Sequence, residues 1–433
     1  MNITVIALGK VGLPVAALYA ARGHRVTGCD LSPAVVNAVN AGVSTLPHEP
    51  GLAERLAAVV SSGQLTATTD TVVGVVGAEV VIVLVPLDVD AAHQPDFRSM
   101  DGAFQTIASA LKPGTLVILE TTVPVGTCRS RYLPVFEQGG RRCGVDFFFA
   151  FSPERLQAGR VERDLDTYPR VVGGIDAASA ARAAAFYAGN FTVPVITLDS
   201  AEAAEMCKLA ESIYRDVNIA LANELAAYAA ARGIDFMQVI KAANSQPQSH
   251  LHRPGLGVGG HCIPVYPYFL LNDAETAALT LHARRVNDGQ HRLAADQIEA
   301  ALGGLSGRRV LILGLTYRTG VKETAHSPAL DLAAELRQRG AITLGHDPLL
   351  AVDEIAAAGL TSVDLGRPVS ADAVVLHTDD PTYLDFDAST VAGCAVVLDC
   401  AGAWDPARVT ARGITYLALG RPARRPPVSE ARP

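Results

Sequence analysis

The most unusual stretch of the sequence is a glycine-rich loop that ends in a cysteine. It reads PGLGVGGHCIP over residues 254–264, with four glycines between residues 255 and 260. Glycines at this density leave backbone NH groups able to point at an anion, and a thiol beside such groups has a lowered pKa, as a nucleophile needs. A buried structural cysteine in a tight turn is the commoner fate of this residue type. His261 and the glycines make this loop polar and open, so we interpret Cys262 as a candidate nucleophile.

A second chemically suggestive segment lies at the start of the chain. Residues 7–12 read ALGKVG and match the GxGxxG dinucleotide-binding pattern, except that alanine replaces the first glycine. Gly9 would let the backbone approach a pyrophosphate, and Gly12 would let the following helix pack close to the strand. Asp30 follows Gly9 by 21 residues, where an acid accepts hydrogen bonds from ribose hydroxyls and repels a 2′-phosphate. An ordinary strand-to-helix turn is the alternative, but the segment predicts NAD binding.

Short apolar runs alternate with helical patterns over the first 200 residues. Runs of this kind suit a parallel sheet that helices cover on both faces. We therefore expect a doubly wound, Rossmann-like NAD-binding domain over residues 1–200. The expected strands are 2–8, 24–29, 80–85, 116–120, 147–151 and 195–198.

The rest of the chain predicts a helical middle and a second α/β domain. Residues 201–301 should hold a long helix, a shorter one, the cysteine loop and a further helical stretch. Residues 302–420 repeat the strand–helix alternation, and the Pro- and Arg-rich residues 421–433 should form a loose tail. The predicted fold class is α/β, with two Rossmann-like doubly wound domains joined by a long central helix. Strands of the second domain are expected at 310–313, 342–346, 373–377 and 395–399.

Composition excludes several classes of protein. Apolar residues make up 49% of the 433 and charged residues 18%, which is a globular composition for two or three domains and not a disordered chain. A net charge of −8 offers no basic field to hold nucleic acid. The seven cysteines form no CxxC or zinc-finger spacing, so we expect neither a disulfide framework nor a metal, and a reducing cytoplasm. Residues 72–87, the longest apolar stretch, are interrupted and too short to span a membrane, and no signal peptide is evident.

Several segments, taken in order, make the chain resemble the nucleotide-sugar 6-dehydrogenase family of UDP-glucose, UDP-N-acetylhexosamine and GDP-mannose dehydrogenases. The resemblance runs from residue 3 to about residue 400, and its GGHCIP form looks more like the N-acetylhexosamine and related branches. The segments that carry it are EPGL at 49–52, TTVP at 121–124, FSPER at 151–155, YPRVVGG at 168–174, KL at 208–209, RDVNIALANEL at 215–225, GVGGHCIP at 257–264 and GLTY at 314–317.

The resemblance implies two successive NAD-dependent oxidations of a sugar C6 alcohol to a carboxylate. Cys262 would attack the intermediate aldehyde to give a thiohemiacetal, and the second oxidation would give a thioester that water hydrolyses. Lys208 would stabilise the oxyanion, Glu154 would act in acid–base work, and Thr122 would hold a water or a substrate hydroxyl. From the residues alone, each has a plainer alternative. Lys208 could be a solvated helix lysine, Glu154 could form an ion pair with Arg155, and Thr122 could cap a turn.

The resemblance also implies two binding sets and an assembly. The partner is a nucleotide-diphosphate sugar, with no nucleic acid and no membrane, and a homodimer through the long central helix is expected. The cofactor-binding set is Gly9, Lys10, Val11, Gly12, Asp30, Pro86 and Thr122. The substrate-binding set is Glu154, Arg155, Lys208, Arg253, Gly255, Gly257, Gly259, Tyr317 and Lys322.

Three positions depart from the family pattern. Ser212 replaces the usual asparagine four residues after the lysine, and Tyr266 replaces the usual aspartate four residues after the cysteine. Ala325 stands where an arginine is usual, and Arg318 or Lys322 could compensate. The serine can still hydrogen-bond and joins the catalytic candidates, whereas tyrosine cannot act as a carboxylate base at neutral pH. Two alternatives therefore stay open: an enzyme that releases the 6-aldehyde after one oxidation, and a catalytically weak nucleotide-sugar-binding homologue.

Overall fold

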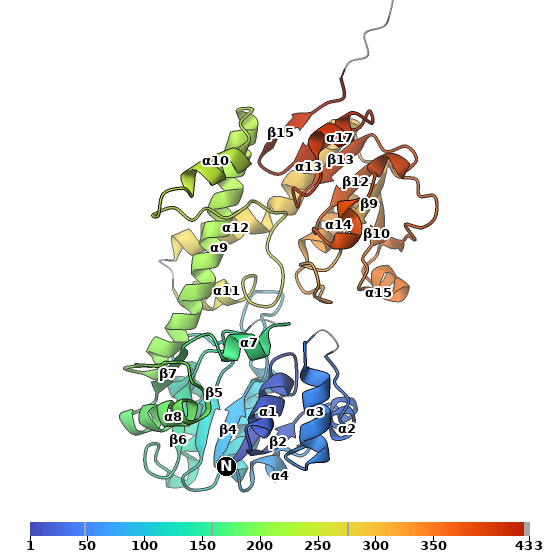
Figure 1. Cartoon of the computed structure of the whole chain (residues 1–433). Helices are drawn as coiled ribbons and strands as arrows, with labels where there is room; N and C mark the ends of the chain where they lie inside the picture. Colours follow the sequence, from blue (N-terminus) through green and yellow to red (C-terminus); the bar gives the residue numbers. More distant parts are fainter. Residues whose placement is uncertain (47–48, 157–158, 275–276, 428–433) are drawn as a thin grey trace, which may run out of the picture. The chain divides into compact units, whose positions relative to one another are not determined.

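The computed structural model describes residues 1–46, 49–156, 159–274 and 277–427 (Figure 1). The chain divides into two compact units: the first holds residues 1–211 and 268–274, and the second holds 212–267 and 275–433. Helix α9 (Ala201–Ala231) runs from one unit into the other. The expected domains, residues 1–200, 201–301 and 302–420, stay a prediction beside this division into two units.

The first unit contains an eight-stranded sheet in the order β3-β2-β1-β4-β5-β6-β7-β8. Neighbouring strands are parallel except β6 and β7, which pair antiparallel. The order reverses between β1 and β4, and ligands of open α/β sheets bind outside the carboxyl ends of the strands at such a point. The strands are β1 (Asn2–Ile6), β2 (Arg25–Cys29), β3 (Leu65–Thr68), β4 (Val80–Val83), β5 (Leu116–Leu119), β6 (Phe148–Phe151), β7 (Arg170–Gly174) and β8 (Val195–Leu198).

Burial explains why the central strands appear in the sequence as short, continuous apolar runs. The Val, Ile and Leu side chains of β4 and β5 are at most 1% exposed, since helices cover both faces of the sheet. The antiparallel β6–β7 pair corrects our expectation of a wholly parallel sheet. The helices of this unit are α1 (Gly12–Ala21), α2 (Pro33–Asn40), α3 (Leu52–Ser61), α4 (Thr71–Val75), α5 (Arg98–Ala110), α6 (Leu133–Phe136), α7 (Val161–Leu165) and α8 (Ala177–Asn190).

The second unit contains a seven-stranded sheet in the order β11-β10-β9-β12-β13-β14-β15. It repeats the strand–helix alternation of the first, so the predicted fold class of two Rossmann-like α/β domains with a long central helix is confirmed. The strands are β9 (Arg309–Leu313), β10 (Ile342–His346), β11 (Thr361–Ser362), β12 (Ala373–Leu376), β13 (Val396–Asp399), β14 (Thr415–Ala418) and β15 (Arg421–Arg424). The helices are α10 (Phe236–Ala243), α12 (Ala278–Asp288), α13 (Gln290–Leu302), α14 (Pro328–Gln338), α15 (Val352–Ala357), α16 (Pro381–Leu384) and α17 (Pro406–Thr410), and the short α11 (Tyr266–Leu271) follows the cysteine loop.

The carboxyl-terminal residues differ from the loose tail that we expected from residue 421. Gly420, with φ of 70°, lets the chain reverse, and β15 pairs antiparallel with β14. The carbonyl of Gly420 accepts a hydrogen bond from the Phe236 amide at 2.8 Å, which ties this turn to α10. Residues 428–433 lie outside the described part. Across the described residues, no helix combines the length and apolar character that crossing a membrane requires.

Candidate functional site

The first strand-to-helix turn contains two glycines, Gly9 and Gly12, whose surroundings differ. A Cβ at Gly12 would lie 1.8 Å from the carbonyl oxygen of Ala7, so packing of the helix against the turn requires glycine there. A Cβ at Gly9 would meet nothing within 4 Å. Protein packing therefore does not explain Gly9, and the open surface beside it at the start of α1 fits the approach of a pyrophosphate.

Asp30 is fixed to this turn by backbone hydrogen bonds. Its Oδ2 accepts from the Leu8 amide at 2.8 Å, and its Oδ1 accepts from the Ser32 amide at 2.9 Å. An ionised carboxylate has about four acceptor positions, so capacity for ribose hydroxyls remains.

The other predicted cofactor residues lie around the same edge of the sheet. Val11 is the N-cap residue of α1, and Lys10 is exposed, with a pKa lowered by partial burial. Pro86 is exposed in the segment after β4, the strand beside β1. Thr122 follows β5 and is 2% exposed. The structure thus places the cofactor set at the carboxyl ends of β1, β2, β4 and β5, and this arrangement fits NAD.

Lys208 and Glu154 lie together in the first unit. The Lys208 Nζ donates a hydrogen bond to the backbone oxygen of Glu154 at 2.6 Å, and the lysine is only 9% exposed. Burial raises the pKa of the Glu154 carboxyl, and the positive charge of Lys208 opposes that rise. This lysine is therefore not a solvated helix side chain, and the neighbouring ammonium and carboxyl groups are suited to stabilising an oxyanion and to moving a proton.

Arg155 and Ser212 have separate surroundings. Arg155 forms an ion pair with Glu211 at 2.9 Å and donates to the Pro169 carbonyl at 3.1 Å, so the structure shows Glu211 as its acidic partner. Ser212 lies one helical turn after Lys208 on α9 and is 6% exposed.

Sequence reasoning missed Glu205, which sits one turn before Lys208. Its carboxylate accepts hydrogen bonds from the Gly126 amide at 2.5 Å and the Cys128 amide at 2.9 Å, although the side chain is fully buried. It therefore anchors the segment that follows Thr122 to the helix that carries Lys208. The available signal was an acid among apolar and small residues on a long helix.

The glycine-rich loop in the second unit has some NH groups that are already engaged. The Gly255 amide donates to Asn223 Oδ1 at 2.9 Å, and the Gly260 amide donates to the Ala325 carbonyl at 2.9 Å. Within the described residues, no such bond is found for the amides of residues 257–259. This corrects the expectation that all four glycines leave their NH groups available, and it leaves the middle of the loop as the part able to meet an anion.

These glycines also permit close packing. Gly257 and Gly260 have φ of 141° and 87°, values that side chains rarely adopt. A Cβ at Gly259 would lie 2.5 Å from the Tyr317 Cβ, so the loop packs directly on the segment after β9. The structure thus brings Gly259 and Tyr317 together, whereas Gly257 lies against Asn287 and Pro328.

Two predicted cationic residues lie elsewhere in the second unit. Lys322 forms an ion pair with Glu354 at 2.8 Å. Arg253 is exposed and lies beside Gly402, where an added Cβ would be 3.3 Å from its Nη2. Neither contact itself speaks for or against a role in holding a diphosphate.

Cys262 is the exposed member of the seven cysteines, all of which lie in the described part of the chain. Its carbonyl accepts from the Tyr266 amide at 2.9 Å, which starts α11 directly after the loop. Burial raises the pKa of Cys29 to about 12 and that of Cys394 to about 11, which makes those thiols poor nucleophiles.

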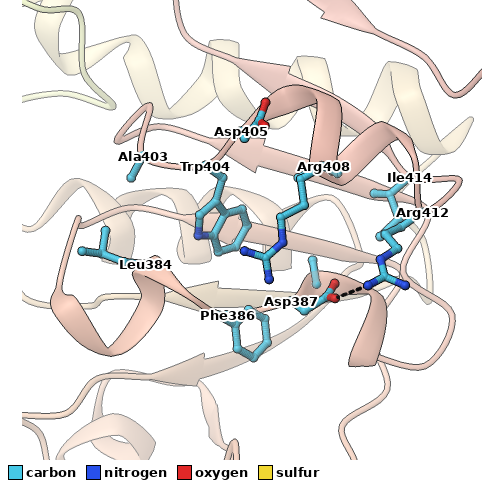
Figure 2. Close-up of a pocket in the computed structure, with 11 residues that line it drawn as sticks. Leu384, Phe386, Asp387, Ala403, Trp404, Asp405, Arg408, Arg412 and Ile414 are labelled. Atoms are coloured by element: carbon cyan, nitrogen blue, oxygen red, sulfur yellow. Dashed lines mark ion pairs between the residues drawn. The ribbon is translucent and has the colours of Figure 1, made fainter.

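A cavity of about 220 Å³ lies in another part of the second unit, between the segment after β12 and α17 (Figure 2). The rings of Phe386 and Trp404 line it, 6.1 Å apart, together with Arg408 and an ion pair of Arg412 with Asp387. None of the residues predicted from the sequence lines this cavity, so we do not include it in the site.

Comparison with known proteins agrees with a Rossmann-like NAD-binding domain. Family models of the UDP-glucose/GDP-mannose dehydrogenase family match residues 1–190 (NAD binding domain), 202–289 (central domain) and 311–406 (UDP binding domain). The UDP-N-acetyl-D-mannosamine dehydrogenase of Pyrococcus horikoshii is 37% identical over 391 residues, which cover 88% of this chain and 90% of that protein. The NDP-N-acetyl-D-galactosaminuronic acid dehydrogenase of Ralstonia nicotianae is 33% identical over 422 residues, covering 95% and 98%.

A solved structure extends this likeness to three dimensions. The UDP-D-ManNAc dehydrogenase from Pyrococcus horikoshii superposes with a TM-score of 0.87 at 32% identity, covering 97% of this chain and 99% of that one. The chain belongs to the UDP-glucose/GDP-mannose dehydrogenase family. It is an NAD-dependent dehydrogenase that acts on a nucleotide sugar.

Proposed function

We propose that this enzyme oxidises the C6 alcohol of a UDP-N-acetylhexosamine to the uronic acid, in a four-electron reaction through a thioester on Cys262. The observation that carries the proposal is the exposed thiol of Cys262 at the end of a glycine loop, in a chain whose other cysteines are buried or half-buried. The relatives named UDP-N-acetyl-D-mannosamine dehydrogenase and the GGHCIP sequence support an N-acetylhexosamine.

The proposed chemistry needs the thiol for the second oxidation. An aldehyde has no carbinol from which a second hydride can leave, and addition of the Cys262 sulfur to its carbonyl carbon creates one as a thiohemiacetal. Loss of hydride from that carbon leaves a thioester, and attack by water releases the acid and regenerates the thiol. When bound, NAD supplies the hydride acceptor for each of the two oxidations.

The remaining residues have proposed roles at the oxygen and at the water. The Lys208 ammonium stabilises negative charge on the C6 oxygen. The Glu154 carboxyl, whose pKa burial raises, takes and returns a proton during thioester hydrolysis. The buried hydroxyl of Thr122 holds a water or a substrate hydroxyl, and the buried hydroxyl of Ser212 supplies a further hydrogen-bonding group.

The testing experiment counts NADH formed per sugar by the whole chain. UDP-N-acetylmannosamine, UDP-N-acetylglucosamine, UDP-N-acetylgalactosamine and UDP-glucose are each supplied in limiting amount with excess NAD. Two NADH per sugar and a uronic acid product support the proposal. One NADH and a released aldehyde would favour the alternative of a single oxidation, to which Tyr266 in place of a carboxylate points.

Cysteine variants test the covalent step directly. Cys262→Ala should lose acid formation by several powers of ten, because no thiohemiacetal can form. Cys207→Ala, which alters a half-buried cysteine on α9, is the matched control and should keep the wild-type rate. Acid formation by Cys262→Ala at the wild-type rate would refute the thioester route.

We further propose that the enzyme is a homodimer formed through α9. Tyr214, Leu221 and Tyr228 recur at seven-residue spacing, which puts them on one face of the helix, and they are 59%, 42% and 58% exposed. Light scattering after gel filtration should report two chains for the wild type and one chain for Leu221→Glu. A wild-type monomer at micromolar concentration would refute the proposal.

A further inference from the structure

A chain of buried polar side chains lies behind the cysteine loop in the second unit. Asp216 and Asn223 are on α9, and Arg284 and Asn287 are on α12; all four are at most 2% exposed. Such groups are costly to bury unless they are hydrogen-bonded, and well-packed apolar side chains of similar volume often serve stability as well or better. Joining two helices would not by itself require them.

The hydrogen bonds run in one direction, from the loop to a single carboxylate. The Gly255 amide donates to Asn223 Oδ1 at 2.9 Å, and Asn223 Nδ2 donates to Asn287 Oδ1 at 3.0 Å. Asn287 Nδ2 then donates to Asp216 Oδ1 at 2.7 Å and to the Asp216 carbonyl at 3.0 Å. The side-chain amides of Asn223 and Asn287 therefore each accept a hydrogen bond through the oxygen and donate one through the nitrogen.

The second branch reaches the other end of the loop. Arg284 Nη1 donates to Asp216 Oδ1 at 2.7 Å and to the carbonyl of Ile263 at 3.2 Å. Arg284 Nη2 also pairs with Asp288, which is about half exposed. Ile263 directly follows Cys262, so the same carboxylate is connected to the backbone just after the nucleophile and to the backbone at the start of the loop.

We propose that Asp216, Asn223, Arg284 and Asn287 are positioning residues that hold the two ends of the loop and so set the place of the Cys262 thiol. The glycines make this necessary, because glycine loses more conformational freedom on ordering than any other residue, and four of the six residues 255–260 are glycines. The catalytic consequence rests on the proposed function of Cys262, but the anchoring of the loop does not.

The test uses Asn287→Ala and Asn223→Ala in the full-length chain. Asn287→Ala removes the link between Asn223 and Asp216, and Asn223→Ala removes the acceptor of the Gly255 amide while leaving the pair of Asp216 with Arg284 intact. Hydrogen–deuterium exchange of a peptide covering residues 255–263 should accelerate by about tenfold or more in both variants, since amide protection requires a hydrogen-bond acceptor. Asn218→Ala is the matched control, because Asn218 is half-buried on the same helix and, among the described residues, its side chain donates to the Tyr214 carbonyl and to no part of the loop.

Kinetics distinguishes positioning from general destabilisation. Acid formation should fall by roughly ten- to a hundredfold in kcat, because a misplaced thiol slows the chemical step that follows substrate binding. The KM for the nucleotide sugar should rise as well, because the loosened loop holds the predicted substrate-binding glycines, whereas a mere loss of folded enzyme would lower kcat alone. Unchanged loop exchange in both variants would overturn the inference whatever their activity. If the wild type oxidised no nucleotide sugar while the variants still loosened the loop, the proposed function would fail and the anchoring would stand.

Discussion

Glu205 should make the free energy of unfolding depend on pH, because its surroundings change its pKa on folding. Its carboxyl is fully buried, and desolvation raises its pKa from the ordinary value of 4.5 to about 7, although the amides of Gly126 and Cys128 partly oppose the rise. The folded chain therefore binds a proton here between about pH 4.5 and pH 7, where the unfolded chain does not. Replacing Glu205 with glutamine removes this proton uptake.

The sign and magnitude follow from proton linkage. A group whose folded pKa is raised contributes stability that is complete below pH 4.5 and is lost as pH rises through about 7. Each pKa unit corresponds to about 1.36 kcal/mol, so the contribution lost over this window is about 3 kcal/mol. The free energy of unfolding of the wild type, measured relative to Glu205→Gln, should fall by about that amount between pH 4.5 and pH 7.5.

Urea unfolding of the whole chain across this pH range measures the difference. Far-UV circular dichroism follows both units, and fluorescence of Trp404, the one tryptophan, follows the second unit and so separates its transition from that of the first. The pH slope of the difference isolates the titration, because any fixed cost of the amide substitution is the same at every pH. A flat difference, or a wild type that gains on the variant as pH rises, would show that the backbone amides outweigh burial and keep Glu205 ionised.

Four further predictions concern the cofactor turn and the lysine. Gly9→Ala should weaken NAD binding at nearly unchanged melting temperature, whereas Gly12→Ala should destabilise the fold by several kcal/mol because of its 1.8 Å overlap; calorimetry with and without NAD separates the two. Ala7→Gly should raise the free energy of unfolding by up to about 1 kcal/mol, since Ala7 has φ of 74°. Asp30→Ala should lower the kcat/KM preference for NAD over NADP by about tenfold or more. Lys208→Ala should lower kcat by roughly a hundredfold with little change in KM, and unchanged turnover would leave the lysine a structural role.

The sequence predicted best what is local. The turn at residues 7–12, the buried strands and the cysteine loop each carry their signal within a few consecutive residues, and the structure places all of them as elements of the expected kind. The contacts that hold the site could not be read in this way. Glu205 meets the Gly126 amide across 79 residues, and Asn287 meets Asp216 across 71, so neither pairing has a local pattern. In both pairings the polar side chain lies on a helix, and in the sequence it looks like an ordinary polar residue of that helix.

The two α/β domains show why a Rossmann-like fold alone does not identify the cofactor site. After β9, Gly314 has φ of 84°, much as Ala7 has 74° after β1, and an acid directly follows the next strand in both domains. Asp347 is 4% exposed, and its Oδ2 accepts from the amides of residues 315 and 316 at 2.7 and 2.9 Å.

In the turn after β9, the backbone NH groups of residues 315 and 316 are therefore already bonded to Asp347, and this carboxylate is used within the protein. In the first domain, Asp30 accepts from the Leu8 amide of the turn and from the Ser32 amide that follows it, and a Cβ at Gly9 would meet nothing within 4 Å. We therefore expect the same backbone path to bind a dinucleotide where its acid keeps acceptor capacity and its glycine keeps room, and to act as a structural turn where a buried acid accepts from both backbone donors. Asp347 accepts from the Leu315 amide, the Thr316 amide and hydroxyl and the Leu349 amide, two hydrogen bonds more than Asp30 accepts. This difference agrees with the family models, which match an NAD binding domain over residues 1–190 and a UDP binding domain over residues 311–406.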